Sequence, residues 1–396
     1  MSGRGADAPA MKASAMSSIL IGGDIYPAGR IQRAFEHGDA DAIFHDLRDE
    51  IANADLAIVN LESPLVDTGT PIPKSGPVLG APTSCIKGFA AAGWHVLNLA
   101  NNHSFDHGAV GLKSTMQAIR GAGLDYVGAG DNLSQARMPL VREIRGQRVV
   151  IYAMAEREFS IADRYTPGAN PLDVMDFVRA IREYKQGGVF IVLVHGGAEY
   201  YPYPPPEMMR RSRFMVDMGA DAVVCCHTHC PLPWELYSGR PIVYGLGNLI
   251  FEAMSDEADP WYQGYLAKLE IKNGAVRFTP VPYVQSCDRP GARRMEPTEL
   301  GTFHDLMASR GQDLDDEEAL QGRWLEYCRS QRDSYLAMLF GYGRVMFRLR
   351  RTLLRALHSK QVARRALLLV QCETHRERLI ALFQAIRHRD QEVSRG

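Results

Sequence analysis

Short apolar runs alternate with longer stretches of helical pattern over roughly the first 288 residues. Each run is only a few residues long and rich in Ile, Val, Leu and Ala, as expected of a buried strand. Strands that alternate with helices over some 200 residues indicate α/β layers with a largely buried sheet. The runs are Ser18 to Gly22, Ala57 to Leu61, His95 to Ala100, Val189 to Val194 and Ala222 to Cys226.

Three later apolar runs are separated by turn signals rather than by helical stretches. They are Arg240 to Phe251, Gly264 to Ile271 and Ala275 to Tyr283, and Asn273-Gly274 between the last two is a hairpin signal. We therefore expect antiparallel strands here. After Pro290 the pattern becomes helical, which predicts a main domain over residues 17–288 and a helical region over 289–396. The small and polar residues at the start of the chain predict a loose N-terminus over residues 1–16.

Length and composition narrow the class of protein. The 396 residues are 46% hydrophobic and 23% charged, which excludes a mostly disordered chain, and the net charge of −1 argues against a nucleic-acid-coating protein. The longest apolar runs are far shorter than the roughly 20 residues that span a bilayer. Residues 1–15 do not resemble a signal peptide, and the seven cysteines include no CxxC pair. We expect a soluble cytoplasmic protein without a disulfide framework.

Polar residues that can bind a metal follow five of the predicted strands. In open α/β sheets, ligands bind outside the carboxyl ends of the strands. A lone Asp or His at such a position is more often a turn or hydrogen-bonding residue, but five consecutive strand ends together predict a metal site with mixed oxygen and nitrogen ligands. These residues are Asp24, Glu62, Asn102 with His103, His195, and His227 with His229.

Two neighbouring features have competing interpretations. Cys226 and Cys230 could form a zinc thiolate pair, but Cys225 and Cys226 fit better as small apolar residues that end a buried strand. The segment from Tyr200 to Pro206 could be a polyproline-type ligand, but its position just after His195 and Glu199 favours a stiff pocket wall.

The same residues lie in motifs that resemble a known family. The order of these motifs is that of the CapA (poly-γ-glutamate capsule synthesis) family, which is similar to calcineurin-like metallophosphoesterases. The resemblance covers about residues 18–285. It rests on Gly23-Asp24, Asn60-Leu61-Glu62, Leu99 to Gly108, His195 to Tyr200, His227-Thr228-His229 and Tyr244 to Phe251.

The resemblance implies a four-layer αββα metallophosphoesterase-like sandwich, to which this chain adds a C-terminal helical region. It also implies one or two divalent ions at the edge of the sandwich, with Mn, Zn, Fe and Mg all left open. Transferred residue by residue, it gives metal ligands Asp24, Glu62, Asn102, His195, His227 and His229; a proton donor, His103, oriented by Asp106; and substrate contacts Glu199, Tyr200 and Asn248.

Two positions depart from the phosphoesterase pattern. Tyr26 stands where a second ligand, often His, follows the first aspartate, so the metal position of Asp24, Glu62 and His229 is expected to bind more weakly than the other. Ser104 stands where an acid usually follows the histidine. Both departures are compatible with the CapA pattern.

The functional expectation is metal-assisted hydrolysis of an anionic polymer or a phosphorylated substrate, in capsule or poly-γ-glutamate-type polymer biosynthesis. Two alternatives stay open: a non-catalytic metal-containing binding or assembly factor for an anionic polymer, and a generic cytoplasmic metallophosphodiesterase. No specific nucleic-acid partner is expected.

The C-terminal 56 residues are strongly basic, with thirteen Arg and Lys against four Asp and Glu. Arg344, Arg348, Arg351 and Arg355 share one helix face, and Met346, Leu349, Leu353 and Leu357 share another. We expect these helices to dock on the main domain, whose charge is opposite. Peripheral contact with an anionic membrane surface, or with an anionic polymer, is the alternative. Every proposed ligand precedes Pro290, so the chemistry is not expected to need this region.

Overall fold

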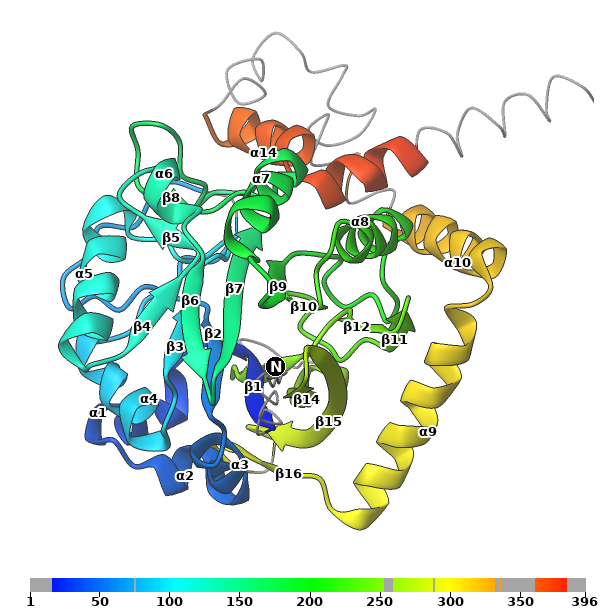
Figure 1. Cartoon of the computed structure of the whole chain (residues 1–396). Helices are drawn as coiled ribbons and strands as arrows, with labels where there is room; N and C mark the ends of the chain where they lie inside the picture. The colour runs from blue at the N-terminus through cyan, green and yellow to red at the C-terminus, as the bar shows by residue number, and fades with distance from the viewer. Residues whose placement is uncertain are drawn as a thin grey trace, which may run out of the picture.

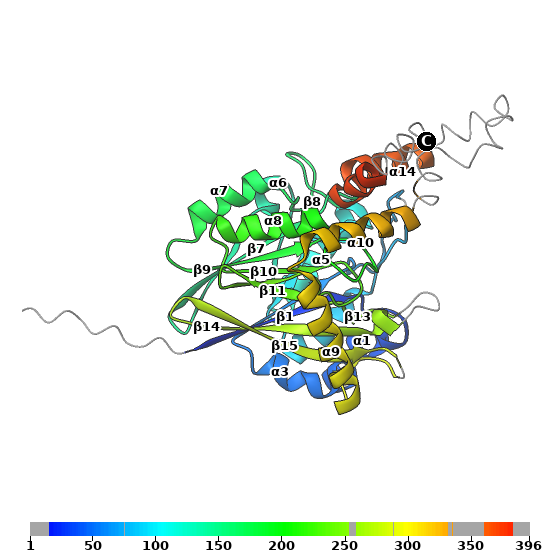
Figure 2. The same ribbon diagram turned by 90° about the vertical axis from the view of Figure 1, so that its right-hand side faces the viewer.

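The computed structural model describes residues 16–74, 76–252, 259–287, 289–331, 335 and 360–382. Two β-sheets lie face to face, and helices cover the outer face of each sheet (Figures 1 and 2). The expected α/β fold, a four-layer αββα sandwich, is therefore confirmed.

The first sheet has eight strands and carries the N-terminal part of the chain. Its parallel half contains β1 (Ser17–Ile25), β2 (Leu56–Leu61), β3 (Val96–Asn98) and β4 (Asp125–Val127). Its antiparallel half contains β14 (Gln263–Lys272), β15 (Ala275–Gln285) and β16 (Ala292–Arg294) on the other side of β1. The short strand β13 (Asn248–Ile250) pairs with the end of β1.

The second sheet has six strands in the order β11 (Trp234–Tyr237), β12 (Arg240–Val243), β10 (Ala222–Cys226), β9 (Val189–His195), β7 (Gln147–Ala155) and β6 (Leu140–Ile144). A separate two-stranded ribbon consists of β5 (Ala129–Gly130) and β8 (Gly168–Ala169).

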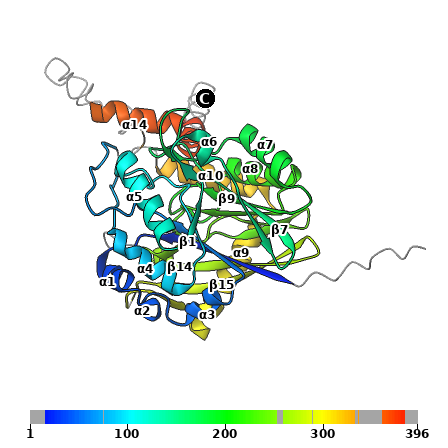
Figure 3. The ribbon, with the colours of Figure 1, turned by 60° about the vertical axis from the view of Figure 1, so that its left-hand side comes forward.

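Alternation along each strand assigns its side chains to two different cores, because successive residues of a strand point to opposite faces. Ile19 and Ile21 of β1 lie in the core between the sheets, whereas Leu20 lies in the core under the outer helices. The helices over the first sheet are α1 (Gln32–His37), α2 (Ala40–Phe44), α3 (Arg48–Ala52), α4 (Ile86–Ala92) and α5 (Gly108–Gly121) (Figure 3).

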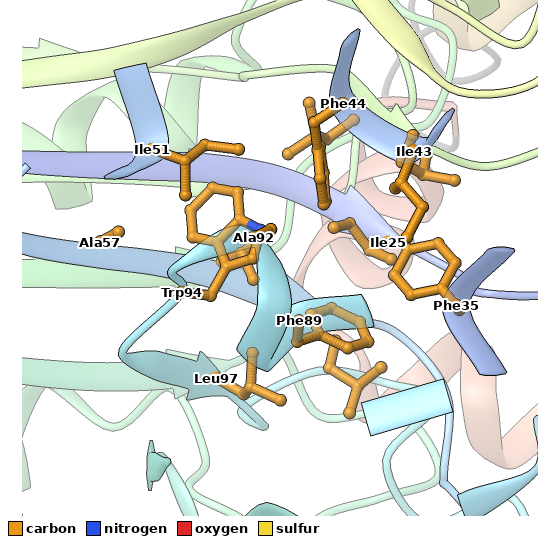
Figure 4. Close-up of a cluster of buried hydrophobic side chains, with 14 of the residues drawn as sticks. Ile25, Phe35, Ile43, Phe44, Ile51, Ala57, Phe89, Ala92, Trp94 and Leu97 are labelled. Atoms are coloured by element: carbon orange, nitrogen blue, oxygen red, sulfur yellow. The ribbon is translucent and has the colours of Figure 1, made fainter. Parts of the chain in front are cut away.

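Aromatic side chains fill the space between the first sheet and its helices. Phe35, Phe44, Phe89 and Trp94 are all buried, and their rings contact one another in tilted or edge-on pairs (Figure 4). On the second sheet, α7 (Val174–Tyr184) and α8 (Pro206–Asp217) pack over Tyr152, Phe190 and Val223, and α6 (Leu133–Ala136) follows the ribbon strand β5. Short 3-10 turns complete the connections: Gly29–Ile31, His45–Leu47, Thr83–Cys85 and Asp259–Tyr262.

One sequence-based expectation needs correction. Residues 240–251 were expected to form an antiparallel strand, but the chain leaves the second sheet after β12 and enters the first sheet as β13. β12 is antiparallel to β11 and parallel to β10, and β13 is parallel to β1. The crossing brings Gly247 against Gly23. A Cβ atom on residue 23 would lie 2.0 Å from the Gly247 carbonyl oxygen. Glycine at position 23 permits this close approach.

Described residues after 289 pack on the sandwich. The predicted boundary at 288–289 falls between β15 and β16 of one sheet. Helix α9 (Pro297–Asp313) follows, and its Phe303 and Met307 join the core between the sheets. Helix α10 (Glu317–Ser330) lies beside α8, and α14 (Lys360–Gln371) precedes a second helical stretch over residues 373–382 (Figure 1).

Part of the basic region can be placed and part cannot. Residues 360–382 dock on the main domain, as the contacts described below show. The helix face of Arg344, Arg348, Arg351 and Arg355 and the apolar face of Met346, Leu349, Leu353 and Leu357 lie outside the described residues. All seven cysteines are free thiols. In the described segments, no helix combines the length and the apolar character needed to cross a bilayer.

The packing of α9 predicts that residues beyond 289 unfold together with the sandwich. Phe303→Ala should destabilise the full-length protein by about 3–5 kcal/mol, because a fully buried aromatic ring is lost from the core between the sheets. Denaturant unfolding measures this change. The control is Leu306→Ala, an exposed residue of the same helix, which should change stability by less than about 1 kcal/mol. A small, equal effect of both substitutions would show that α9 folds independently of the sandwich.

Candidate metal centre

The carboxyl ends of strands from both sheets meet at one edge of the sandwich. Asp24 lies near the end of β1, Glu62 directly follows β2, and Asn102 and His103 come after β3. His195 ends β9, and His227 and His229 follow β10. All of these side chains are buried. The structure thus brings the sequence-predicted ligands to one place.

Glu62 is the most unusual residue of this cluster. Its side chain is completely buried, and neither carboxylate oxygen has a hydrogen-bond partner among the described residues. Burial, reinforced by the nearby Asp24 carboxylate, raises the pKa of Glu62 well above its usual range. The Nε2 atom of His195 lies 3.6 Å from Glu62 Oε1. A buried carboxylate without donors is costly unless a cation compensates its charge.

Two groups of ligand atoms share Glu62. One consists of Glu62, His195 and His227, and the other of Asp24, Glu62 and His229; within each group the atoms lie within 4.8 Å of one another. The donor set of carboxylates and imidazoles fits divalent transition metals. Because Glu62 belongs to both groups, it would help to hold an ion in either of them.

Asn102 lies beside the first group. Its Oδ1 atom is 3.0 Å from Nε2 of His195, the nitrogen that also faces Glu62. The rings of His195 and His227 have centroids 4.6 Å apart. Burial, with further contributions from His227 and His229, lowers the pKa of His195 well below its usual range, so this imidazole is neutral, as a metal ligand must be.

The loop that carries His227 and His229 has an unusual backbone. Their φ angles are 98° and 55°, in the left-handed region that residues other than glycine rarely adopt. Two contacts hold this conformation: the His227 N–H donates to Asp24 Oδ2 at 3.0 Å, and Nδ1 of His229 lies 2.8 Å from Asn248 Oδ1. Strained residues of this kind concentrate at functional sites. Asn248, expected to contact substrate, here contacts a candidate metal ligand.

A network of amides that the sequence did not single out supports Asp24. Asn60 donates to Asp24 Oδ1 at 2.7 Å and accepts hydrogen bonds from Asn98 and Asn101 at 3.0 and 3.1 Å. Groups that hydrogen-bond a ligand fix its orientation and contribute to metal affinity. The motif Asn60-Leu61-Glu62 could have revealed the role of Asn60. Asn60 and Glu62 are alternate residues at the end of β2, so both side chains can reach the same site.

His103 belongs to a different set of contacts. Its Nδ1 atom lies 2.7 Å from Asp106 Oδ2 and 3.1 Å from Nζ of Lys74, and Lys74 also donates to the other oxygen of Asp106. Burial lowers the pKa of His103, while the hydrogen bond to Asp106 opposes that effect. Lys74 was not predicted, because it comes from a loop with no recognisable pattern. Ser104 donates to the Asn101 carbonyl, so the nearby acid is Asp106 instead.

The cysteines in and just after β10 do not converge on one ion. Cys225 packs in the core under α7 and α8, and the Cys230 thiol lies 3.8 Å from the Tyr201 carbonyl oxygen. Only Cys226 is near the centre, with its sulfur 3.3 Å from Nδ1 of His195. The structure therefore favours the interpretation of Cys225 and Cys230 as buried small residues.

A pocket of about 310 Å³ opens beside the cluster. Glu199 and Tyr200, expected to contact substrate, line it, and the Tyr200 ring stacks on Trp261 with centroids 5.7 Å apart. Neighbouring imidazoles of His227 and His229 outweigh the effect of burial and lower the pKa of Glu199, which is therefore an anion at neutral pH. Other lining residues include Lys74, Asn102, His103, Glu158, His229, Leu368 and His375.

Two of these residues come from the region after Pro290, which was not expected to be needed for the chemistry; that expectation stays a prediction. Leu368 and His375 belong to the C-terminal region and line the same pocket as Asn102 and His103. Glu158, on the segment after β7, also escaped the sequence analysis; it accepts from Asn102 at 3.2 Å and approaches His227 at 3.7 Å. Burial raises the pKa of Glu158.

Comparisons with known proteins found one matching family profile and several relatives. Residues 18–253 match the sequence profile described as "Bacterial capsule synthesis protein PGA_cap". The capsule biosynthesis protein CapA of Bacillus anthracis is 32% identical over 245 residues, which are 59% of this chain and 60% of the relative. The PGA biosynthesis protein CapA of Bacillus subtilis is 30% identical over 267 residues, or 66% and 69% of the two chains.

Among solved structures, a hypothetical protein from Thermus thermophilus is similar over 67% of this chain and 99% of its own, at 16% identity and a TM-score of 0.45. The match to the first curated relative spans less than two thirds of that relative's length.

The two ligand groups should bind metal with different strength. The group of His195 and His227 has two imidazoles, whereas the group of Asp24 and His229 has Tyr26 where a second nitrogen donor would stand. The Tyr26 hydroxyl lies 3.5 Å from the Gly80 carbonyl oxygen, and burial raises its pKa, so a phenolate ligand is disfavoured. Calorimetric titration with Mn²⁺ should therefore show a tight and a weak step.

Substitutions identify which step belongs to which group. His227→Ala should remove the tight step, and His229→Ala should remove the weak one. His304→Ala, an exposed histidine of α9, is the control and should leave both unchanged. A tight step that survives His227→Ala would contradict the proposed order.

Proposed function

Because this chain belongs to the bacterial capsule synthesis protein family PGA_cap, we propose that it acts in the synthesis of a capsule or poly-γ-glutamate-type polymer through a metal-dependent hydrolase site. Its substrate would be an anionic polymer or a phosphorylated molecule. The cytoplasmic location, and a peripheral membrane contact through the basic C-terminal helices, stay predictions.

The observation that supports a metal site most directly is the Glu62 carboxylate. It is buried, has no hydrogen-bond donor among the described residues, and has candidate ligands on two sides. Divalent cations, when bound, would supply Lewis acidity and a more acidic water at this position. Asp24, Glu62, Asn102, His195, His227 and His229 would hold them.

The remaining polar residues fit distinct tasks around the pocket. The carboxylate of Asp106 fixes the His103 ring through Nδ1, which leaves Nε2 as the nitrogen available to a substrate. In this position His103 can transfer a proton to a leaving group. An anionic group in the pocket would raise the pKa of His103, because negative charge stabilises the imidazolium and opposes the effect of burial. Substrate binding would thus prepare the proton donor.

The pocket walls suggest how a substrate is oriented. Tyr200 and Trp261 form a stacked aromatic pair beside His229, whose ring centroid is 4.9 Å from that of Trp261. Such a surface excludes water from one side of the cluster. Lys74 is the cationic side chain that lines the pocket beside His103, and its ammonium group is paired with Asp106. Neutralisation of an anionic substrate would therefore depend mainly on the bound cations.

A single substitution separates metal binding from chemistry. His103→Ala should keep its metal, because His103 is not in either ligand group, and should lose about 10²–10⁴-fold in turnover, the usual contribution of general acid catalysis. Turnover is measured with chromogenic phosphodiester and γ-glutamyl amide substrates, and metal content by elemental analysis. Asp106→Asn, which keeps the ring but weakens its orientation, should lose less.

Three results would change the proposal. Loss of metal in His103→Ala would mean that His103 is itself a ligand. Metal-loaded wild-type protein without turnover on either class of substrate would favour a non-catalytic binding or assembly factor. Turnover on simple phosphodiesters alone would favour a general metallophosphodiesterase.

A further inference from the structure

The C-terminal segment of residues 360–382 docks at the rim of the pocket through several polar contacts. The Arg157 N–H donates to Glu373 at 3.0 Å, and the Glu207 N–H donates to Glu377 at 3.1 Å. Thr374 donates to Glu156, which also pairs with Arg211 at 3.0 Å. Figure 1 shows this segment beside α8. The docked segment thereby reaches residues that directly adjoin the candidate metal centre.

Docking places three potential ligands together. Atoms of Glu158, Cys372 and His375 lie within 4.8 Å of one another, and none of these residues belongs to the two groups that share Glu62. The Cys372 side chain is buried, and His375 faces the pocket. A thiolate, an imidazole and a carboxylate on convergent chains are the ligand types of zinc sites.

The surroundings of these residues resemble the supporting contacts of a metal site. The Tyr335 hydroxyl lies 2.8 Å from Nδ1 of His375, which orients the ring and leaves Nε2 for a ligand. Asn102 donates to one oxygen of Glu158 at 3.2 Å and leaves the other oxygen facing His227. Contacts of this kind fix the orientation of metal ligands.

The local charge also calls for a cation. Glu156 is compensated by Arg211, but within the described part of the chain no lysine or arginine lies within ion-pair distance of Glu158. Its side chain is only 9% exposed, and Glu199 adds a second carboxylate near His227. Glu158 belongs to neither of the two ligand groups that share Glu62.

We propose that Glu158, Cys372 and His375 form a separate Zn²⁺ site, which joins the C-terminal segment to the edge of the main metal centre. The ordinary alternative is that Cys372 is a small buried residue at a packing contact and His375 only hydrogen-bonds Tyr335. The two differ in zinc stoichiometry and in whether Cys372 ligates a metal. The proposal does not require the hydrolase function, since it concerns metal binding alone.

The first test counts bound zinc. Full-length protein is equilibrated with Zn²⁺, dialysed and analysed for metal content. Wild type should hold one equivalent more than Cys372→Ser or His375→Gln, whereas Cys328→Ser, a buried thiol of α10 outside all ligand groups, should match wild type. Equal zinc content in wild type, Cys372→Ser and His375→Gln would overturn the proposal. His227→Ala should lose zinc from the main centre, so failure of that centre is seen separately.

The second test identifies the sulfur ligand and does not depend on the folding of one variant. Co²⁺-loaded wild type should show thiolate-to-cobalt charge-transfer absorption in the near ultraviolet. The band should vanish in Cys372→Ser and persist in Cys226→Ser, since Cys226 is the other cysteine with potential metal-ligand neighbours, Asp24 and His195. Absence of the band in wild type, or its loss in Cys226→Ser alone, would contradict a site at Cys372.

Discussion

The cost of burying the Glu62 carboxylate is the constraint on which the rest of this site depends. A charged oxygen pair removed from water without hydrogen-bond donors is strongly unfavourable unless an opposite charge approaches it. The neighbours are Asp24 and three imidazoles, which are ligands rather than permanent cations. The proposed divalent ions would resolve this conflict, because they would stabilise the carboxylates and use the neutral form of His195 that burial already favours.

The scaffold holds these residues before any ion binds. The end of β1 can approach β13 closely because glycines occur at 23 and 247, and the crossing chain then supplies Asn248 to His229. The left-handed His227 is held by Asp24 itself. His227 and His229 therefore depend on contacts from the ends of other strands. Because these strands belong to both sheets, the core that packs the sheets together also sets the geometry of the centre. Leu368 and His375 of the C-terminal segment add to the wall of the pocket.

Sequence reasoning succeeded where the relevant signal is local. An apolar run followed at once by Asp24, Glu62 or His195 reveals both the strand and the polar group at its end, and the family motifs add their order. It failed where contacts join distant segments. Lys74 and Glu158 lie on loops, and His375 lies on a C-terminal helix. The hydrophobic pattern of the sequence does not show where these segments pack against the sheets. The prediction for residues 240–251 was wrong because this single apolar run contains strands of two different sheets. The chain crosses from one sheet to the other near Gly247, between β12 and β13. The three ligand-bearing strands of the parallel half could be foreseen, and so could docking of the C-terminal region, but not that Leu368 and His375 would line the pocket.

The most direct test of the central claim compares the stability of wild type and Glu62→Gln with and without metal. In chelator, the amide should be at least as stable as the carboxyl, since burial disfavours the charged form of Glu62. With Mn²⁺ at about 100 times its dissociation constant, wild type should gain about 2.7 kcal/mol of unfolding free energy, and Glu62→Gln should gain much less. If Glu62→Gln is at least as stable as wild type in chelator but less stable in Mn²⁺, the result would support the claim that the Glu62 carboxylate binds cations. An equal gain in both proteins, or no gain in wild type, would contradict it.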